Sequence, residues 1–282
     1  SEIISLEFQF CDIEGIEESI LGGGMVYWGT DIIDEDPLFC NSDSSDFTLF
    51  NNSPCVATGQ DGTNMGAYGV GCYIPSHEGP VWHVSTEGSD LNSGSEEYPF
   101  ETLQKGIDAS SDGDTVLVMS GTYPVNHLTV NNKAISIIAE NNNVIIDGQN
   151  QNRILSVTNS MERTFIIDGF TIQNGDAQNQ DGFVIQATGG TNFFNNLILK
   201  DNGQGRGHTL FRGNHPDSTF FNNCIVADNS AENAAGIGHS TVTNSLIYGN
   251  HGSNNSAPLN QCIVRNCTII NNGGGNPGGA VS

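Results

Sequence analysis

The chain has 282 residues, of which only 36% are hydrophobic, while glycine fills 35 positions and asparagine 34, a composition that disfavours a compact globule and favours a repetitive β architecture with many turns. Acidic residues number 32 against 8 basic ones, the net charge is −24, and 19 carboxylates precede the first basic residue, Lys105. A field of this sign repels nucleic acid, anionic lipid and polyuronate chains and attracts divalent cations, and the sequence holds no apolar run of about 20 residues, so DNA binding and membrane insertion are disfavoured.

Two acidic loops in the first third of the chain are candidates for binding calcium. One spans residues 31–36 and the other spans residues 88–94. The candidate ligands are Asp34 and Asp36 in the first loop, and Asp90 and Asn92 in the second. Carboxylate and amide oxygens are the ligands that Ca²⁺ prefers, but neither loop has the glutamate that completes an EF-hand, so a solvated acidic loop is the alternative. The repulsion among the carboxylates predicts that Ca²⁺ stabilises this region.

Seven cysteines indicate disulfide chemistry rather than a metal site. They stand at positions 11, 40, 55, 72, 224, 262 and 267, with no CxxC or Cys/His ligand spacing. The pairing cannot be deduced, and the odd count leaves one thiol free or bonded to another chain. Disulfides predict an extracellular or cell-surface location. N-x-S/T sequons begin at Asn51, Asn254 and Asn266, of which Asn51 and Asn254 are the expected glycosylation sites.

Residues 99–119 predict a short helix followed by a buried strand. Phe100, Leu103 and Ile107 recur at helical spacing, and residues 115–119 form an apolar run. We expect this helix to plug the open end of a solenoid.

From about residue 165 the sequence repeats. Five segments, 168–174, 196–202, 223–229, 244–250 and 266–272, each carry Asn or Asp, an apolar stretch, and Asn six positions on, and their last residues are 28, 27, 21 and 22 positions apart. This period predicts one short strand per coil of a solenoid, in which equivalent residues stack about 4.8 Å apart. No LxxLxL repeat and no GGxGxD block occurs, which leaves an all-β, right-handed parallel β-helix. The predicted structural ladder is Asp168, Asn174, Asn196, Asn202, Asn223, Asn229, Asn244, Asn250, Asn266 and Asn272.

Two regions resemble the pectate-lyase-like right-handed parallel β-helix superfamily, in particular its large bacterial surface proteins. Residues 81–123 resemble the opening, capping module of these proteins. The first 72 residues resemble their closing module, with CDIEG at Cys11–Gly15 followed by related motifs at 33–39, 47–55 and 61–69. The resemblance implies a solenoid fold, and in many relatives it accompanies cleavage of acidic sugars by a calcium-bridged carboxylate cluster with a Lys or Arg base.

The order of these modules is inverted, because the closing module comes first. The predicted organisation is a closing module at 1–75, an opening module at 76–125 and β-helix coils at 126–282. Joining residue 282 to residue 1 would place Asp12 at 22 positions after Asn272, the same step as between the last two segments. Three interpretations of the inverted order remain. The chain is one unit of a tandem-repeat polypeptide, a subunit whose first coils complete the open β-helix of a neighbouring subunit, or a two-domain fragment. We expect Ile3–Cys11 of one unit to pair with Val264–Ile270 of another.

The sequence favours a structural role over an enzymatic one. Candidate parts of a sugar-cleaving site are Asp181, Asp201, Arg206, His208, Arg212, His215 and the Gly238–His239 dipeptide. Paired aspartates and an RxK motif are missing, and Asp201 occupies a position that Asp228 and Gly249 fill in later coils, so we assign no catalytic residue. The favoured function is a structural or adhesive unit that assembles with copies of itself into a fibre or stalk, with carbohydrate as a second partner. The alternative is a polysaccharide lyase or glycoside hydrolase.

Overall fold

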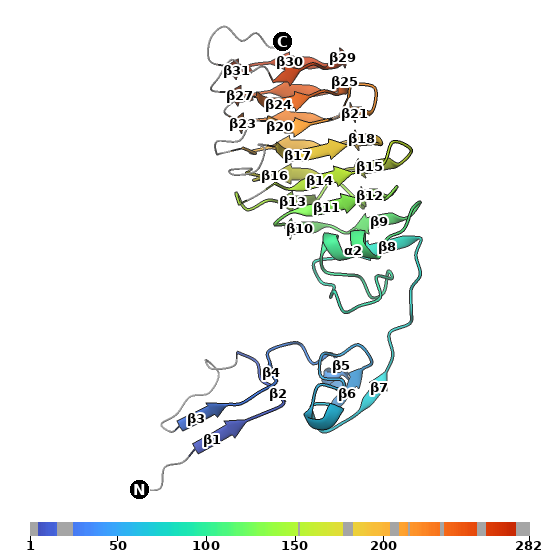
Figure 1. Ribbon diagram of the computed structural model, residues 1–282, viewed down its shortest axis with the longest axis vertical. Coiled ribbons are helices and arrows are strands. Elements are labelled where there is room, and N and C mark those ends of the chain that lie inside the picture. Colours follow the sequence, from blue (N-terminus) through green and yellow to red (C-terminus); the bar gives the residue numbers. More distant parts are fainter. Residues whose placement is uncertain are drawn as a thin grey trace. The chain divides into compact units, whose positions relative to one another are not determined.

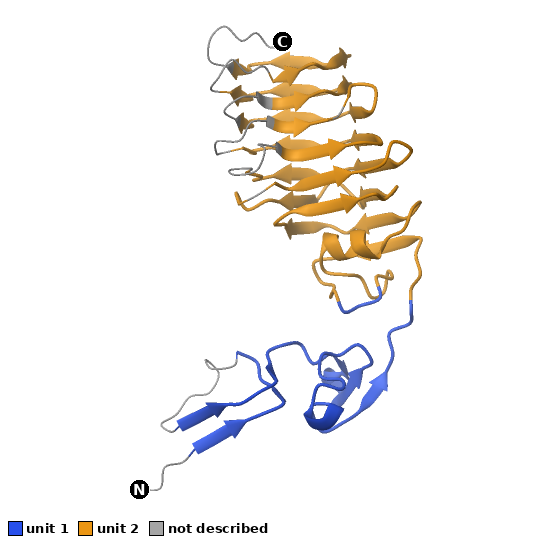
Figure 2. Ribbon diagram, in the orientation of Figure 1, with its two compact units in different colours: residues 1–76, 91–93 blue, residues 77–90, 94–282 orange. Residues whose placement is uncertain are grey.

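The computed structural model describes residues 5–15, 25–151, 153–176, 183–203, 209–213, 215–231, 234–252 and 258–274. They belong to two compact units, which are considered separately (Figure 2). Unit 1 comprises Ser1–Ser76 with Leu91–Ser93, and unit 2 comprises His77–Asp90 with Gly94–Ser282. The first strands of the β-helix in unit 2 lie within residues 76–125, the range of the predicted opening module. No described helix is long and apolar enough to cross a membrane.

Unit 2 is a right-handed parallel β-helix, as the sequence predicted (Figure 1). Sheet 1 consists of β8 (Val81–Val84), β9 (Thr115–Val118), β12 (Ser136–Ala139), β15 (Thr164–Asp168), β18 (Thr191–Asn195), β21 (Thr219–Asn222), β25 (Thr241–Thr243) and β29 (Ile263–Arg265). Sheet 2 consists of β10 (Gly121–Pro124), β13 (Val144–Asp147), β16 (Thr171–Gln173), β19 (Ile198–Lys200), β22 (Ile225–Ala227), β26 (Leu246–Tyr248) and β30 (Thr268–Ile270). Sheet 3 consists of β11 (Leu128–Asn131), β14 (Leu155–Thr158), β17 (Phe183–Thr188), β20 (Thr209–Arg212), β24 (Ala234–Gly238) and β28 (Leu259–Asn260). Sheet 4 consists of β23 (Ser230–Ala231), β27 (His251–Gly252) and β31 (Gly273–Gly274).

The interior of the β-helix is filled by stacks of equivalent apolar residues. Each strand pairs in parallel with the strand of the next coil, so that Phe194 lies between Ile167 and Phe221 in sheet 1. The rings of Phe194, Phe211 and Phe221 meet at centroid distances of 4.6 to 4.8 Å. Such aromatic pairs contribute about 0.5–1.5 kcal/mol each beyond the area that they bury, so this triplet anchors the core of the later coils.

Helix α2 (Leu103–Ala109) covers the first coil. The side chain of Thr102 caps its N-terminus by accepting a hydrogen bond from the Lys105 amide at 3.2 Å. Leu103 and Ile107 are buried, and Gly106 permits close approach, because a Cβ there would stand 2.8 Å from Val116. The helix therefore seals the apolar interior at this end, which the sequence predicted.

The coils turn at residues with left-handed backbone conformation. In each later coil two such residues are five positions apart, and the first lies between sheets 1 and 2. The pairs are Gly169 and Asn174, Asn196 and Asp201, Asn223 and Asp228, Asn244 and Gly249, and Asn266 and Asn271. Asparagine, aspartate and glycine tolerate this conformation best, which explains the composition of the chain. We call the first residue of each pair the corner residue.

Unit 1 contains two stacked rungs and a small separate sheet. The rungs are formed by β1 (Ser5–Phe8) with β2 (Cys11–Asp12), and by β3 (Met25–Trp28) with β4 (Ile32–Ile33). β1 pairs in parallel with β3 and β2 with β4, so this segment has the coil geometry of unit 2. The separate sheet contains β5 (Phe39–Asn41), β6 (Asp46–Phe50) and β7 (Val70–Cys72), with the 3-10 turns η1 (Ser42–Ser44) and η2 (Gln60–Gly62) nearby. A disulfide joins Cys40 to Cys72.

Candidate functional site: two asparagine ladders and a groove

A buried ladder of asparagine side chains runs along the β-helix. Asn202, Asn229 and Asn250 are each 1% exposed. Asn229 donates its Nδ2 to Asn250 Oδ1 at 2.8 Å and to the carbonyl of Leu199 at 2.9 Å, while its Oδ1 accepts from Asn202 Nδ2 at 3.0 Å. Asn272 continues the ladder by accepting from Asn250 Nδ2 at 2.9 Å. Each side chain thus satisfies polar groups of two coils, which would be costly to bury unpaired.

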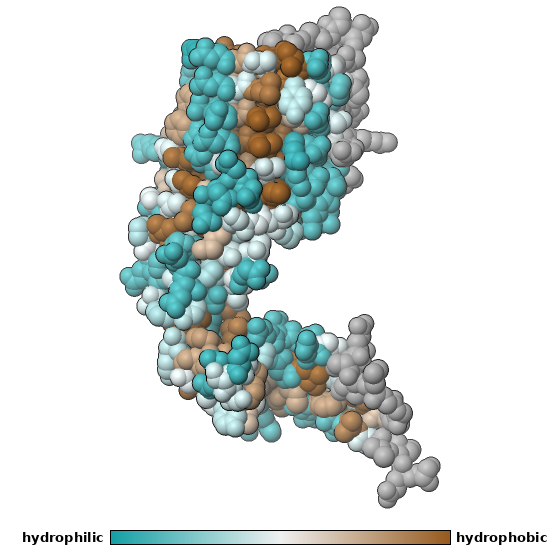
Figure 3. All heavy atoms as spheres, turned by 180° about the vertical axis from the view of Figure 1, so that it is seen from behind, coloured by the Kyte–Doolittle hydropathy of each residue, from teal (hydrophilic) through white to brown (hydrophobic). Residues whose placement is uncertain are grey.

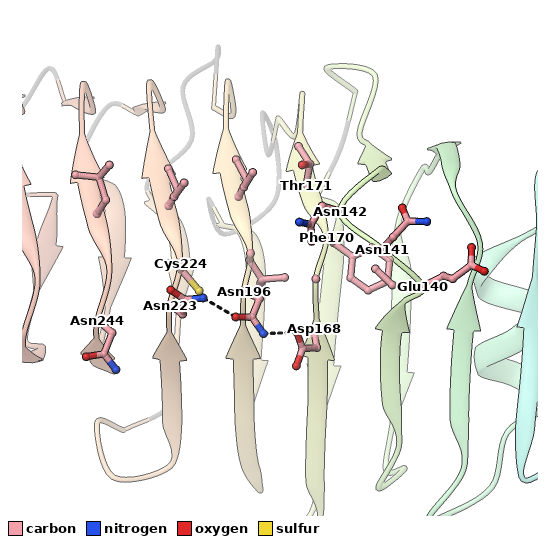
Figure 4. Close-up of a pocket in the computed structure, with 16 residues that line it drawn as sticks. Glu140, Asn141, Asn142, Asp168, Phe170, Thr171, Asn196, Asn223, Cys224 and Asn244 are labelled. Atoms are coloured by element: carbon pink, nitrogen blue, oxygen red, sulfur yellow. Dashed lines mark hydrogen bonds between the residues drawn. The ribbon is translucent and has the colours of Figure 1, made fainter.

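A second ladder runs along the exposed corner between sheets 1 and 2. Asn196 Nδ2 donates to Asp168 Oδ1 at 2.6 Å, and Asn223 Nδ2 donates to Asn196 Oδ1 at 2.7 Å (Figure 4). The row then changes partners, because Asn244 donates to Asn222 at 2.9 Å. Asn266 Nδ2 donates to Asn244 Oδ1 at 3.4 Å, which is the longest bond of the series. These side chains are solvent-accessible, so each bond contributes less than one in the buried ladder.

The register differs by one residue from the sequence prediction in the earliest predicted segment. Asp168 pairs with Asn195, and the backbone amide of Gly175 donates to Asn202 Oδ1 at 2.9 Å across a step of 27 residues. Gly169 and Gly175 therefore hold the positions predicted for Asp168 and Asn174. Asp168 joins the exposed ladder through its side chain, whereas Asn174 is the second left-handed residue of its coil and donates to Asp147 Oδ2 at 2.9 Å. The prediction was wrong here because glycine replaces asparagine at both positions of this coil.

A groove of about 640 Å³ follows the exposed ladder. Its floor includes Ile198, Ile225 and Leu246, which are in register on sheet 2 and partly exposed. Its polar wall is the exposed ladder, and residues 139–142 close one end (Figure 4). An apolar column flanked by hydrophilic columns is also visible on unit 2 in the space-filling view (Figure 3).

The groove has acidic and amide groups but no basic ones among its lining residues. Glu140 and Asp168 are its two carboxylates. Lyase chemistry needs a base that removes a proton and a cation that neutralises the sugar acid, and neither Lys, Arg nor His lines the groove. The loop residues Glu140, Asn141 and Asn142 were not identified from the sequence, because nothing in a three-asparagine run indicates which strand it faces. The lining offers amide and carboxylate groups for hydrogen bonding beside an apolar floor.

The candidate catalytic residues lie elsewhere. Asp201 is a left-handed turn residue whose carboxylate lies 3.6 Å from Lys200 Nζ. Arg212 pairs with Gly238 in sheet 3, and Gly238 directly precedes His239. Burial, together with the charges of Arg212 and His215, lowers the pKa of His239. His215 is exposed, 3.4 Å from Asp217. Asp181, Arg206 and His208 lie outside the described residues. The described members do not line the groove.

The candidate calcium ligands are held by backbone donors. Asp34 Oδ1 accepts from the Gly15 amide at 3.0 Å, and Asp36 Oδ1 accepts from the Leu38 amide at 2.9 Å. Asp90 uses both oxygens, accepting from the amides of residues 101 and 102 and from Thr102 Oγ1 at 2.7 Å. Asn92 belongs to unit 1. Within the described ranges, no group of three or more His, Cys, Asp or Glu side chains is arranged to hold a metal ion.

The predicted sequons and cysteines are placed as follows. Asn51 is exposed in unit 1, and its Oδ1 accepts from the Ile74 amide at 2.8 Å. Asn254 lies outside the described residues, and Asn266 is a corner residue. The cysteines other than Cys40 and Cys72 are free thiols: Cys11, Cys55, Cys224, Cys262 and Cys267. Burial raises the pKa of Cys224 to about 12, so that thiol is unreactive at neutral pH.

The coil formed by residues 258–274 presents unpaired strand edges within the described part of the chain. β28, β29, β30 and β31 are each the outermost strand of their sheet. Its interior residues Cys262, Val264, Cys267 and Ile269 are only partly buried, whereas the equivalent Phe221 and Val242 are fully buried. β1 is likewise an outermost strand, and Leu6 on it is 51% exposed.

The chain is similar over part of its length to one curated protein and to one solved structure. No family model matches the sequence. Over 122 residues it is 32% identical to uncharacterized protein YwoF of Bacillus subtilis (strain 168), an alignment covering 38% of this chain and 25% of that protein. The chain therefore spans about a quarter of the length of the curated relative that it matches. Among solved structures, a rhamnogalacturonan lyase is similar at 18% identity and a TM-score of 0.28, covering 62% of this chain and 70% of that one. Neither similarity assigns an activity.

Proposed function

We propose that this protein is an extracellular structural unit that assembles end to end with copies of itself into a fibre or stalk. The observation that supports this most directly is the coil at residues 258–274, which among the described residues has four unpaired parallel edges and a partly buried interior. Exposed strand edges recruit further strands, and native proteins block them unless pairing is their purpose. The rungs of unit 1 have the same parallel geometry and offer an unpaired edge on β1.

The extracellular location is supported by the disulfide between Cys40 and Cys72, since such bonds persist in oxidising compartments. The net charge of −24 supports solubility of an extended assembly and disfavours adhesion to nucleic acid or anionic lipid. Glycosylation at Asn51 and Asn254 fits the same location and is testable by mass spectrometry of protein secreted from a glycosylating host.

Sedimentation velocity over a hundredfold range of concentration tests the proposal. We expect a series of species that lengthens with concentration, and negative-stain electron microscopy should show linear particles. A single monomeric species at all concentrations would contradict end-to-end assembly.

Carbohydrate binding in the groove is a second candidate function. The observation that favours it is the row of amide and carboxylate side chains beside an apolar floor, because sugars present alternating hydroxyl groups and apolar faces. We expect Asn196→Gly, which keeps the left-handed corner, to weaken binding of a neutral glycan measured by calorimetry, and Asn229→Ala, in the buried ladder, to act only through stability. Release of sugar fragments that is lost in both Glu140→Gln and Asp168→Asn would instead favour the hydrolase alternative.

A further inference from the structure

We propose that residues 5–15 of a second copy form the next coil on residues 262–274, in the register that places Phe10 over Asn266. This inference rests on the proposed end-to-end assembly and specifies the two surfaces and their alignment. Four observations on described residues lead to this register.

The first observation is the backbone conformation of the corner. Phe10 and Gly15 have φ values of 51° and 74° and are five positions apart. Asn266 and Asn271, with φ values of 54° and 53°, have the same separation, as do the corresponding residues of the earlier coils. Phenylalanine rarely adopts this conformation, so its occurrence in unit 1 indicates that the corner of a coil is maintained there.

The second observation is a side-chain hydrogen bond that recurs next to the corner. Cys267 Sγ, one residue after Asn266, donates to the carbonyl of Arg265 at 3.2 Å. Ser245 Oγ and Cys224 Sγ make the equivalent bond two coils in succession, at 2.7 and 3.4 Å. Cys11 Sγ, one residue after Phe10, donates to the carbonyl of Gln9 at 3.2 Å. Cys11 therefore occupies the position of Cys267 by chemistry as well as by conformation.

The third observation is the match between the two interiors. Residues at −4, −2, +1 and +3 from the corner Asn266 are Cys262, Val264, Cys267 and Ile269, the partly buried interior residues of that coil. The same offsets from Phe10 give Leu6, Phe8, Cys11 and Ile13. Each half-buried residue thus meets a side chain able to cover it, and Leu6, 51% exposed, would be buried in turn.

The fourth observation is the direction of the backbone hydrogen bonds at the corner. The amides of Asn223 and Asn244 each donate, at 3.1 Å, to the residue before the corner of the next coil. The Phe10 amide donates to Thr30 at 3.2 Å in the same sense, since Thr30 precedes the left-handed Asp31. Among the described residues Asn266 has no such acceptor, and in the proposed register its amide would donate to Gln9.

This register differs from the one that the sequence step indicated. The 22-residue step predicted that Asp12 stacks over Asn272. The corner geometry instead places Asp12 over Thr268. Both residues stand at the second position after the corner, where Thr268 is exposed and Asp12 is half-buried, accepting from Cys55 Sγ at 3.1 Å.

Thiol cross-linking tests the register. Equivalent residues on neighbouring parallel strands lie about 4.8 Å apart, within the Cα separation that a disulfide spans. Diamide, a diazene oxidant that takes up two electrons and two protons, should join Cys11 of one copy to Cys267 of the next. We expect oligomers on non-reducing gels of the native protein and none for Cys11→Ser or Cys267→Ser alone. An equimolar mixture of these two variants should give dimers only, because just one joint retains both thiols.

Serine is a conservative replacement here, because Ser245 already fills this position in an intermediate coil. Cys224→Ser, at a buried thiol of the same stack, should leave the oligomer pattern unchanged. Sedimentation velocity under reducing conditions then separates the two proposals. Assembly without a Cys11–Cys267 bond would overturn the register and leave end-to-end assembly standing, whereas a monomer at every concentration would overturn both.

A pair of neighbouring substitutions gives an independent readout. Ile269→Asp places a charge in the proposed interior of the joint, whereas Ile270→Asp places it on the outer face, where Ile270 is 50% exposed. We expect Ile269→Asp to raise the concentration needed for assembly at least tenfold and Ile270→Asp to leave it unchanged. Equal effects of the two substitutions would overturn the proposed register.

Discussion

The side-chain oxygen of Asn250 accepts two hydrogen bonds from Asn229, one from its backbone amide at 3.1 Å and one from its Nδ2 at 2.8 Å. The same pair of bonds links Asn202 to Asn229 and Asn250 to Asn272. Because Asn202, Asn229 and Asn250 are buried, the polar groups that link the coils have no water to replace their hydrogen-bond partners.

Replacing Asn229 by alanine should therefore destabilise unit 2 by about 3 kcal/mol, since it leaves buried amides and carbonyls of two coils unpaired. Urea unfolding followed by circular dichroism measures this loss. Asn223→Gly, which removes the exposed-ladder side chain and keeps the left-handed corner, is the matched control and should cost about 0.5–1 kcal/mol, because water can replace its partner. A cost at Asn223 as large as that at Asn229 would contradict the division into a buried and an exposed ladder.

The capping helix should depend on Lys133. Its ammonium group donates to the carbonyls of Ile107, Asp108 and Ser110 at 2.6, 2.9 and 2.8 Å, at the C-terminal end of α2. We expect Lys133→Met to destabilise unit 2 by about 1.5–3 kcal/mol and to increase amide hydrogen exchange in α2. Lys200→Met, which removes an exposed ion pair with Asp201, should cost less than about 1 kcal/mol. The prediction is wrong if exchange in α2 is the same in both variants.

Unit 2 should lose stability in alkaline solution. Burial raises the pKa of Tyr123 from 10.0 to about 12, and its hydroxyl donates to the carbonyl of Met119 at 2.9 Å. The folded state holds the neutral phenol, so this contribution is complete below pH 10 and is lost as the pH rises towards 12. Tyr123→Phe should be less stable than the native protein by about 1 kcal/mol at pH 8 but lose less stability between pH 10 and 12. Identical losses in urea unfolding over that range would exclude Tyr123 as the titrating group.

Calcium should stabilise unit 1. Among residues 1–76 no lysine or arginine offsets the carboxylates, and divalent cations reduce repulsion of this kind. We expect millimolar Ca²⁺ to raise the melting temperature of the unit 1 transition and a chelator to lower it. Sodium chloride at equal ionic strength is the control, and Asp34→Asn with Asp36→Asn should reduce the difference. If the two salts act equally, screening alone accounts for the effect.

The sequence by itself determined the β-helix, because Asn and Gly at regular intervals around short β-branched runs permit few other folds. It also placed α2, since Leu103 and Ile107 follow helical spacing. It did not determine the register of Asp168 and Asn174. Gly169 and Gly175, which hold the equivalent positions in this coil, are also six residues apart, so the spacing alone does not distinguish the two alignments.

Only the tertiary structure separated the buried ladder from the exposed one. Asn223 and Asn229 are the same residue type in one segment, and they differ because one lies at the outer corner while the other points into the coil. The partners of Lys133 and the groove beside Asn196 likewise join positions more than 20 residues apart, and their distance is set by the stacking of coils. A local sequence pattern specifies how each coil turns, but burial and hydrogen-bond partners depend on which coil lies above it.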